Sequence, residues 1–272
     1  MNDTTTEIPL VDTAPKSRAK RVPAAPLQSY YRLAENRWEI GIDEAGRGPL
    51  FGRLYVAGVI LPKDDSFDHG QMKDSKKFHS EKKIRQVADY IRTHATAWHV
   101  AFVEPAVIDE INIRQAVLRG MRECARRLIA AVDPDDPARD IQLLVDGNDF
   151  ESMSILDPSG EKWIEIPHIT VEGGDNTYTA IAAASILAKV ARDDYIAELC
   201  LSRPDLVEKY ALDRNKGYGT KAHMEGIREH GVTEWHRMSY APCKGNQRFP
   251  FDPSLSSGMT LCERNTTMDV FR

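Results

Sequence analysis

The middle of the chain alternates short apolar runs with longer amphipathic stretches. Apolar runs of strand length lie at residues 38–42, 54–61, 98–103, 141–145 and 164–171. Helical periodicity covers residues 82–92, 108–132, 178–200 and 221–230. Ser80 is placed to cap the first of these helices, and Asp133-Pro134 ends the second. The order of the elements predicts an α/β protein in which helices cover a mixed sheet.

Both ends of the chain lack this periodicity. Residues 1–35 contain four prolines and a basic cluster of Lys16, Arg18, Lys20 and Arg21. This composition is typical of a solvated tail, although the cluster is also compatible with an arm that attracts phosphate. Residues 248–272 are irregular as well. We therefore expect one folded domain at residues 36–247, between a disordered N-terminal tail and an irregular C-terminal tail.

Composition and charge exclude several classes of protein. Apolar residues make up 42% of the chain, which is near the average for globular proteins. No apolar run approaches the roughly 18 residues that span a bilayer, and the N-terminus lacks the features of a secretory signal. The four cysteines have no short spacing, so we expect neither a disulfide framework nor a zinc site, and a cytoplasmic location fits. The net charge of −5 means that any contact with nucleic acid must use local patches.

The first chemical signal is a pair of carboxylates, Asp43 and Glu44, where an apolar strand runs into the glycine-rich turn Ala45–Pro49. Neighbouring residues of a strand point to opposite faces, so both can share one site only if the backbone bends, and glycine permits that bend. The turn matches neither the G-x-G-x-x-G nor the Walker A pattern, because Phe51 and Arg47 stand at the deciding positions. A plain turn with two solvated acids is the simpler alternative.

Two further carboxylates also follow the ends of predicted elements. Asp146 ends the strand at residues 141–145 and precedes Gly147, and Asp175 follows two glycines just before the long alanine-rich helix. A helix cap would also explain Asp175. No cluster of histidine or cysteine accompanies these acids, so hard oxygen ligands favour Mg²⁺ or Mn²⁺. Carboxylates that hold two such ions roughly 4 Å apart are the usual apparatus for hydrolysing phosphodiesters.

Basic and aromatic residues supply the other half of a nucleic-acid site. The loop at residues 73–77 carries three lysines, and the helix after Asp175 carries Lys189 and Arg192. The loop at residues 215–220 combines Lys216, two glycines and Tyr218, which suits a stacking surface beside a phosphate contact. Each feature alone is also compatible with a solvated charge run.

These motifs, in this order, resemble those of ribonuclease HII, the type 2 ribonuclease H family. The matching stretches are GIDEAGRGPLFG, MKDSKKF, IDEINI, LLVDG, GGDNTYTAIAAASILAKVARDDY, NKGYGTKAH and HRMSYAP, across roughly residues 38–242. The resemblance implies a ribonuclease H-like fold with a five-stranded mixed sheet flanked by helices, plus C-terminal helices. It also implies an endonuclease that cleaves the RNA strand of RNA–DNA hybrids and incises at ribonucleotides embedded in duplex DNA, leaving 5′-phosphate and 3′-hydroxyl ends.

The resemblance assigns roles to individual residues. The family's metal-binding carboxylates, for two Mg²⁺ or Mn²⁺ ions, fall on Asp43, Glu44, Asp146 and Asp175. Its G-R-G element, which meets the ribose 2′-hydroxyl, falls on Gly46, Arg47 and Gly48, and its K-G-Y tyrosine, which packs on the sugar beside the RNA–DNA junction, falls on Tyr218. Its D-S-K-K lysines and the cations of its K-V-x-R-D helix, expected to contact phosphate or support the site, fall on Lys76, Lys77, Lys189 and Arg192. The composition of the 215–220 loop adds Lys216 as a candidate.

The chain departs from the family pattern at a few positions. Phe51 and Arg53 stand where a small residue and a proline are usual, and Tyr240 replaces a phenylalanine. The interval from Asp146 to Asp175 is long. The sister family, ribonuclease HIII, usually has G-T-G at residues 46–48, so Arg47 argues against it.

Two alternatives of other classes stay open. A catalytically silent protein that binds hybrids would not need all four carboxylates, and a metal-dependent DNA nuclease would lack the G-R-G and K-G-Y pair. We expect a monomer that acts on nucleic acid and contacts no membrane. The sequence TMDVF at residues 267–271 loosely resembles the peptide that docks replication proteins on the sliding clamp, so the clamp is a candidate partner.

Overall fold

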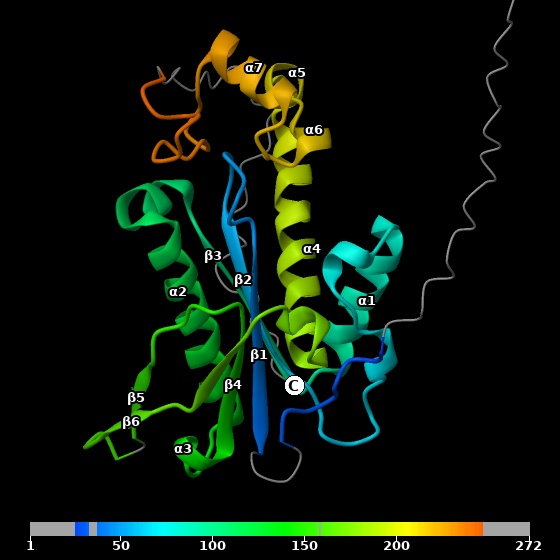
Figure 1. The fold of residues 1–272 in the computed structure, drawn as a ribbon, viewed down its shortest axis with the longest axis vertical. Coiled ribbons are helices and arrows are strands. Elements are labelled where there is room, and N and C mark those ends of the chain that lie inside the picture. The colour runs from blue at the N-terminus through cyan, green and yellow to red at the C-terminus, as the bar shows by residue number, and fades with distance from the viewer. Residues whose placement is uncertain (1–24, 33–36, 158, 247–272) are drawn as a thin grey trace, which may run out of the picture.

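The computed structural model describes residues 25–32, 37–157 and 159–246. Its centre is a five-stranded sheet in the order β3-β2-β1-β4-β7 (Figure 1). The five strands are β1 (Trp38–Ala45), β2 (Leu54–Ile60), β3 (Ala97–Val103), β4 (Ile141–Asp146) and β7 (His168–Val171). β2 runs antiparallel to both β1 and β3, whereas β1, β4 and β7 are mutually parallel. The mixed five-stranded sheet confirms the predicted fold class.

Helices cover both faces of the sheet (Figure 1). α2 (Pro105–Val132) lies on one face, and α1 (Glu81–His94) and α4 (Thr179–Ser202) lie on the other. Ser80 caps α1 by accepting a hydrogen bond from the backbone N–H of Lys83, as predicted. Because side chains alternate along a strand, each strand contributes to both cores.

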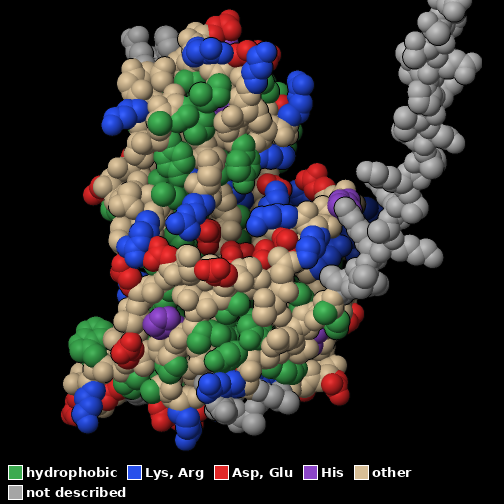
Figure 2. All heavy atoms as spheres, in the orientation of Figure 1, with side chains coloured by type: hydrophobic (Ala, Val, Ile, Leu, Met, Phe, Trp, Pro, Cys, Tyr) green, Lys and Arg blue, Asp and Glu red, His purple; other side chains and the backbone are tan. Residues whose placement is uncertain are grey.

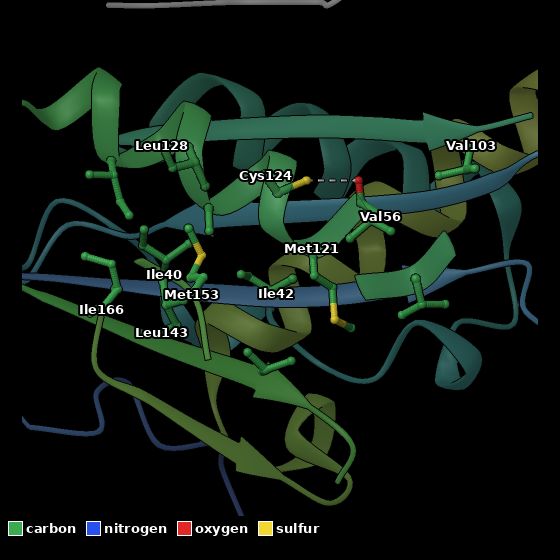
Figure 3. Packing of buried hydrophobic residues seen from close by; sticks show 14 of the residues in the cluster. Ile40, Ile42, Val56, Val103, Met121, Cys124, Leu128, Leu143, Met153 and Ile166 are labelled. Atoms are coloured by element: carbon green, nitrogen blue, oxygen red, sulfur yellow. Dashed lines mark hydrogen bonds between the residues drawn. The ribbon is translucent and has the colours of Figure 1, made fainter. Parts of the chain in front are cut away.

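The core between the sheet and α2 is a continuous apolar layer. Ile40, Ile42 and Val56 from the strands interlock with Met121 and Leu128 from the helix (Figure 3). The Cys124 thiol is buried in this layer and donates to the Val56 carbonyl at 3.4 Å. Burial raises the pKa of the Cys124 thiol to about 12, so this cysteine is an inert core residue.

The opposite face of β1 approaches α4 very closely. Gly41 lies between Ile40 and Ile42 and therefore faces α4. A Cβ atom added at Gly41 would lie 2.2 Å from the carbonyl carbon of Ala180. Glycine on the strand and alanines along α4 let the two backbones pack directly against each other.

Two short helices pack against the C-terminal half of α4, a third packs against the first of them, and together they form a third core. They are α5 (Pro204–Tyr210), α6 (Leu212–Asn215) and α7 (Lys221–His230). Phe51 is fully buried in this core, beside Trp235 and His236, which accounts for a large residue where the family has a small one. Arg53 pairs with Glu104 at 2.6 Å and lies 4.1 Å from the centre of the Phe102 ring, so it too is accommodated by specific contacts.

Two predicted elements differ in the structure. The run at residues 164–171 is not one strand, because Pro167 has no N–H to donate and divides it. Its first part is β6 (Trp163–Glu165), which pairs with β5 (Ser154–Leu156) in a separate hairpin, and only the second part, β7, joins the sheet. The second helix starts earlier than residue 108 and is kinked at Asn112, which has a φ of 66°.

Short turns and a small helix were not predicted. They are η1 (His69–Gln71), η2 (Ser75–Lys77), η3 (Gly174–Asn176) and α3 (Pro137–Asp140). All are three or four residues long, which is too short to produce a periodic pattern.

Part of the expected N-terminal tail contacts the body of the protein. The backbone N–H groups of Tyr31 and Arg32 donate to the carboxylate of Glu39 at 2.9 and 2.8 Å, and Glu39 is only 4% exposed. Gln28 pairs with Tyr178 at the start of α4. The boundaries at residues 35 and 248 stay a prediction, since most of both tails lies outside the described residues. Among the helices of the described part, none has the length and apolar character needed to cross a membrane.

Candidate active site

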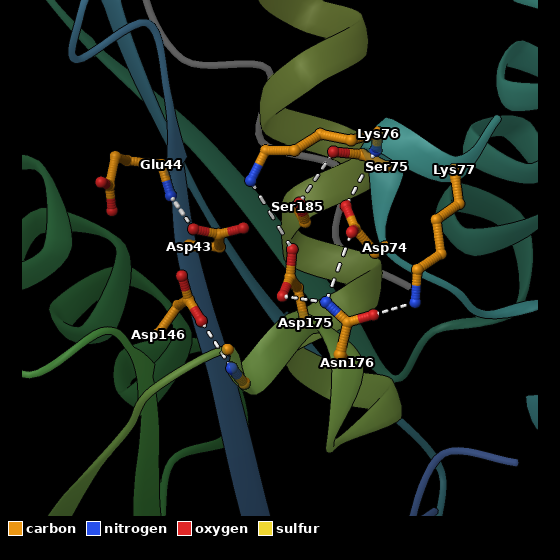
Figure 4. A network of polar contacts seen from close by, with 12 residues as sticks. Asp43, Glu44, Asp74, Ser75, Lys76, Lys77, Asp146, Asp175, Asn176 and Ser185 are labelled. Carbon is orange, nitrogen blue, oxygen red and sulfur yellow. Dashed lines mark hydrogen bonds and ion pairs between the residues drawn. The ribbon is translucent and has the colours of Figure 1, made fainter. Parts of the chain in front are cut away.

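Strand pairing brings two of the predicted carboxylates together. β1 and β4 are parallel neighbours, with Ile42 opposite Val145, so their next residues, Asp43 and Asp146, come side by side at one edge of the sheet. Figure 4 shows both carboxylates pointing into the same space, with Glu44 beside them. Residues about 100 positions apart thus meet because the carboxyl ends of parallel strands share an edge.

Asp43 is buried among groups that oppose its negative charge. Asp43 is only 5% exposed, and its carboxylate accepts a hydrogen bond from the Glu44 backbone N–H at 2.7 Å. Burial, together with the charges of Asp146 and Glu44, holds the pKa of Asp43 well above its ordinary value, although a hydrogen bond from Ser185 of α4 opposes the shift. A carboxylate in such a place is expected at a functional site rather than on a solvated turn.

Glu44 follows Asp43 on β1, and its side chain leaves the other side of the strand but still lines the hollow (Figure 4). The strand ends at Ala45, and Gly46 then adopts a φ of 96°, a conformation that favours glycine. Burial raises the pKa of Glu44, and the Arg47 guanidinium, 3.7 Å away, opposes the shift. The expected bend does not fall between the two carboxylates: both stay in β1, paired with Ala57 and Val56 of β2, and the backbone turns only after Ala45.

Asp175 lies in η3 and is tied to the strand carboxylates through the backbone. The Gly174 N–H donates to Asp146 at 2.7 Å, which fixes the turn that carries Asp175 beside the end of β4. Burial and the charges of Asp74 and Asp146 raise the pKa of Asp175, while Lys76, 4.0 Å away, lowers it. The alternative of a simple cap for the long helix is not observed, because α4 has no side-chain cap.

A polar network behind the carboxylates holds this arrangement (Figure 4). The Asn176 amide donates to Asp175 at 2.9 Å and to Asp74 at 3.3 Å, and Lys77 donates to its oxygen. The Ser75 and Ser185 hydroxyls are hydrogen-bonded at 3.0 Å and join η2 to α4. None of Asp74, Ser75, Asn176 or Ser185 was selected from the sequence. One signal in the sequence could have identified Ser185, namely a hydroxyl residue within the alanine-rich stretch at residues 180–188.

The predicted residues surround one hollow on this face. Figure 2 shows acidic side chains in a band across the middle of the molecule, bordered by lysine and arginine. Ten of the thirteen candidates line this hollow, namely Asp43, Glu44, Gly46, Arg47, Gly48, Lys76, Asp146, Lys189, Arg192 and Tyr218. Asp175 adjoins it through Lys76, whereas Lys77 turns to Asn176 and Lys216 contributes its backbone carbonyl.

The cationic residues divide into exposed and supporting side chains. Lys76 is largely exposed and faces the carboxylates, and Asp175 and Asp74 raise its pKa despite the opposing effect of burial. Arg192 is only 2% exposed and donates to the Lys216 carbonyl at 2.7 Å. Its side chain also fills the space where a Cβ on Gly46 would lie. Arg192 thus joins the Gly46 turn to the loop that carries Tyr218.

The donor set fits a hard divalent cation. In the described part of the chain, no three His, Cys, Asp or Glu side chains are already gathered tightly enough to hold a metal. The four carboxylates nevertheless lie within range of one another's charge, because burial and neighbouring acids, Asp146 among them, raise the pKa values of Asp43, Glu44 and Asp175. A divalent cation would remove that repulsion, and oxygen ligands without imidazole or thiolate suit Mg²⁺ or Mn²⁺.

Comparisons with known proteins by family model, by sequence and by structure all point to ribonuclease HII. The family model described as Ribonuclease HII matches residues 40–243. A ribonuclease HII of Parabacteroides distasonis is 43% identical over 208 residues, covering 76% of this chain and 92% of that protein. A ribonuclease HII of Neisseria gonorrhoeae is 39% identical over 204 residues, covering 75% of this chain and 92% of that protein. Among solved structures, the PCNA:RNase HII complex from Archaeoglobus fulgidus matches with a TM-score of 0.54 and 27% identity, over 75% of this chain and 95% of that one.

Proposed function

The chain belongs to the ribonuclease HII family, and on that premise we propose that it hydrolyses the RNA strand of RNA–DNA hybrids and incises at ribonucleotides embedded in duplex DNA. The observation that carries this proposal is the single hollow in which Asp43, Glu44 and Asp146 adjoin the Gly46–Gly48 turn and the Tyr218 ring. Such a hollow combines groups for phosphodiester hydrolysis with groups for contacting a sugar.

The carboxylates would hold the metal ions. We assign Asp43, Glu44, Asp146 and Asp175 to a two-ion site for Mg²⁺ or Mn²⁺. When bound, two ions supply charge stabilisation to the attacking and leaving oxygens of an in-line displacement. The chain holds its carboxylates in place beforehand, through the Gly174 N–H on Asp146 and the Asn176 amide on Asp175. Lys76 is positioned to contact a phosphate beside them.

The turn at Gly46–Gly48 would distinguish ribose from deoxyribose. The 2′-hydroxyl is the group that separates the two sugars, so it must be contacted directly. The Arg47 carbonyl accepts hydrogen bonds from Arg237 at 3.2 Å and from the Tyr240 hydroxyl at 2.6 Å, which fixes the turn from behind. We therefore assign the sugar contact to the N–H groups of the turn and to the Gly46 carbonyl. A Cβ on Gly48 would lie 3.8 Å from the Tyr218 ring, so turn and ring are adjacent.

A cleavage assay on matched duplexes tests the proposal. The substrates are an RNA–DNA hybrid, a DNA duplex with one internal ribonucleotide, and an all-DNA duplex of the same sequence, each with Mg²⁺, Mn²⁺ or EDTA. We expect metal-dependent cleavage of the first two, with 5′-phosphate and 3′-hydroxyl ends, and none of the third. Binding without cleavage would instead support a silent hybrid-binding protein, and cleavage of the all-DNA duplex would support a DNA nuclease.

A sliding clamp is the proposed protein partner. The Archaeoglobus fulgidus relative was solved in a complex with PCNA, and the candidate docking sequence at residues 267–271 lies outside the described residues. Deleting residues 265–272 should abolish co-purification with the clamp and leave the cleavage rate of free duplexes unchanged, because the deleted segment is remote in sequence from every site residue. Failure of the full-length protein to bind the clamp would remove this proposal.

A further inference from the structure

Tyr218 combines an accessible ring with a tightly held backbone. Tyr218 is 50% exposed and lines the hollow. Its N–H donates to the Asn215 carbonyl at 2.9 Å, and its carbonyl accepts from the Thr220 N–H at 2.8 Å. The neighbouring Gly217 donates to the Asn215 side chain and accepts from the Leu50 N–H, each at 2.8 Å. The loop therefore presents one ring from a backbone with little freedom.

A second group holds the Tyr218 carbonyl, and it comes from a buried pair of histidines. His223 Nδ1 lies 3.0 Å from that carbonyl oxygen, and His223 Nε2 lies 3.2 Å from His236 Nε2. The Thr233 N–H points at His236 Nδ1 at 2.9 Å. Both rings are fully buried, among Phe51 and Tyr210.

These contacts leave one consistent arrangement of protons. Because the Thr233 N–H donates to His236 Nδ1, the His236 proton must be on Nε2. His236 then donates to His223 Nε2, which places the His223 proton on Nδ1, where it faces the Tyr218 carbonyl. Hydrogen bonds thus run in one direction from Thr233 through both rings to Tyr218.

We propose that His223 and His236 act as positioning residues that fix the Tyr218 ring against the substrate. This inference rests on the proposed function, in which Tyr218 contacts the sugar beside the RNA–DNA junction. A ring on an exposed loop contributes most when its backbone is already fixed before the substrate arrives. Burial lowers the pKa of both histidines, which keeps both rings in the neutral form that the proton arrangement requires.

A measurement on the free protein tests the proton arrangement without any activity. Nitrogen-15 shifts of the imidazoles at pH 7.5 should report Nδ1–H on His223 and Nε2–H on His236, with neither ring charged. Nε2–H on His223, or a charged ring, would overturn the proposal. This measurement decides even if the wild-type protein cleaves none of the ribonucleotide-containing duplexes, an outcome that would contradict only the proposed function.

A double-mutant cycle tests the action on Tyr218. His236→Leu removes the donor to His223, and we expect it to slow single-turnover cleavage of the single-ribonucleotide duplex by about tenfold to a hundredfold. In a Tyr218→Ala background the same change should have no further effect, since there is no ring left to position. Effects that multiply would show that the pair serves only the core and would overturn the proposal.

Two variants of the same core separate positioning from stability. His236→Gln keeps an N–H donor toward His223 and should retain the wild-type rate to within a few-fold. Tyr210→Phe removes the 3.1 Å hydrogen bond from Tyr210 to the Gly231 carbonyl but leaves the histidines untouched. It should leave the rate within twofold of wild type. A rate loss for Tyr210→Phe as large as that for His236→Leu would also overturn the proposal.

Discussion

Asp43 is held at a cost to the folded protein, since burial and two neighbouring acids disfavour its charged form. Asp43→Asn removes the charge and keeps an oxygen that can accept from the Glu44 N–H. We expect the variant to be more stable than wild type in EDTA at pH 7.5, by about 0.5–2 kcal/mol. That difference corresponds to a rise of roughly 2–4 °C in Tm per kcal/mol.

The same change should nearly abolish cleavage, because it removes a charge that would face the metal ions. Thermal unfolding and cleavage in Mg²⁺ measure the two effects. The exposed Asp89→Asn, which loses a surface pair with Arg92, is the matched control and should alter stability by less than about 0.5 kcal/mol. Near-normal turnover of Asp43→Asn would remove Asp43 from the metal site.

Tyr218 gives a second prediction, on substrate preference. Tyr218→Ala should slow cleavage at a single embedded ribonucleotide more than it slows cleavage of a long hybrid, because only the former presents a deoxyribose beside every cut. Tyr218→Phe should slow this cleavage less than Tyr218→Ala does if packing of the ring matters more than its hydroxyl. Rates on the two substrates, compared as a ratio, are the measurement. An equal loss on both substrates would indicate general binding in place of junction recognition.

Sequence motifs identified the residues whose chemical type indicates a site, and missed the residues that support them. Asp43, Glu44 and the Gly46–Gly48 turn are contiguous, so their spacing alone indicated a site. Ser185 acts through Ser75, which is 110 positions away, and His223 acts through His236 and the Tyr218 carbonyl. Such roles follow from how elements pack, which no local pattern specifies.

Among the elements, the contact between β1 and α4 places the tightest demand on the sequence. An added Cβ on Gly41 would meet the backbone of Ala180 at 2.2 Å, and backbone atoms cannot move aside as a flexible side chain can. We expect Gly41→Ala to lower the free energy of unfolding by about 3 kcal/mol, at the upper end for overpacking. Urea unfolding measures the loss.

Gly70→Ala is the control for this prediction. Its added Cβ would be 3.1 Å from an oxygen of Asp68, the end of a flexible side chain, so we expect a change below about 1 kcal/mol. Equal losses for the two variants would show that the α4 contact can relax. The elements that the sequence predicted incorrectly also have local causes, namely Pro167 in the strand and the positive φ of Asn112 in the helix.

At the scale of the whole molecule, the buried histidines couple stability to pH. Burial, with a contribution from His223, lowers the pKa of His236 from 6.5 to about 3. As the pH falls, His236 therefore becomes protonated near pH 6.5 in the unfolded chain but only near pH 3 in the folded protein. The stability is fully present above pH 6.5 and is lost progressively as the pH falls toward 3.

Urea unfolding between pH 5.5 and 4 checks this prediction. The slope of stability against pH should be smaller in His236→Gln than in wild type by about 1.4 kcal/mol per pH unit, since that is the linkage for one proton. Subtracting one slope from the other cancels the contribution of the carboxylates, because they titrate in both proteins. Identical slopes would mean that His236 becomes protonated in the folded protein.

α4 carries two parts of the hollow at once. Its first half packs under the sheet and supplies Ser185 beside Asp43, whereas Arg192, two turns further on, supports the loop of Tyr218. At 1.5 Å per residue, the helix sets these two points about 10 Å apart, which is only a few nucleotides along a strand. The helix therefore fixes the distance between these two points. If the proposed roles of Asp43 and Tyr218 hold, this fixed distance separates the bond that would be cut from the sugar that would be contacted, so the cut position should stay constant whatever the length of the duplex on either side.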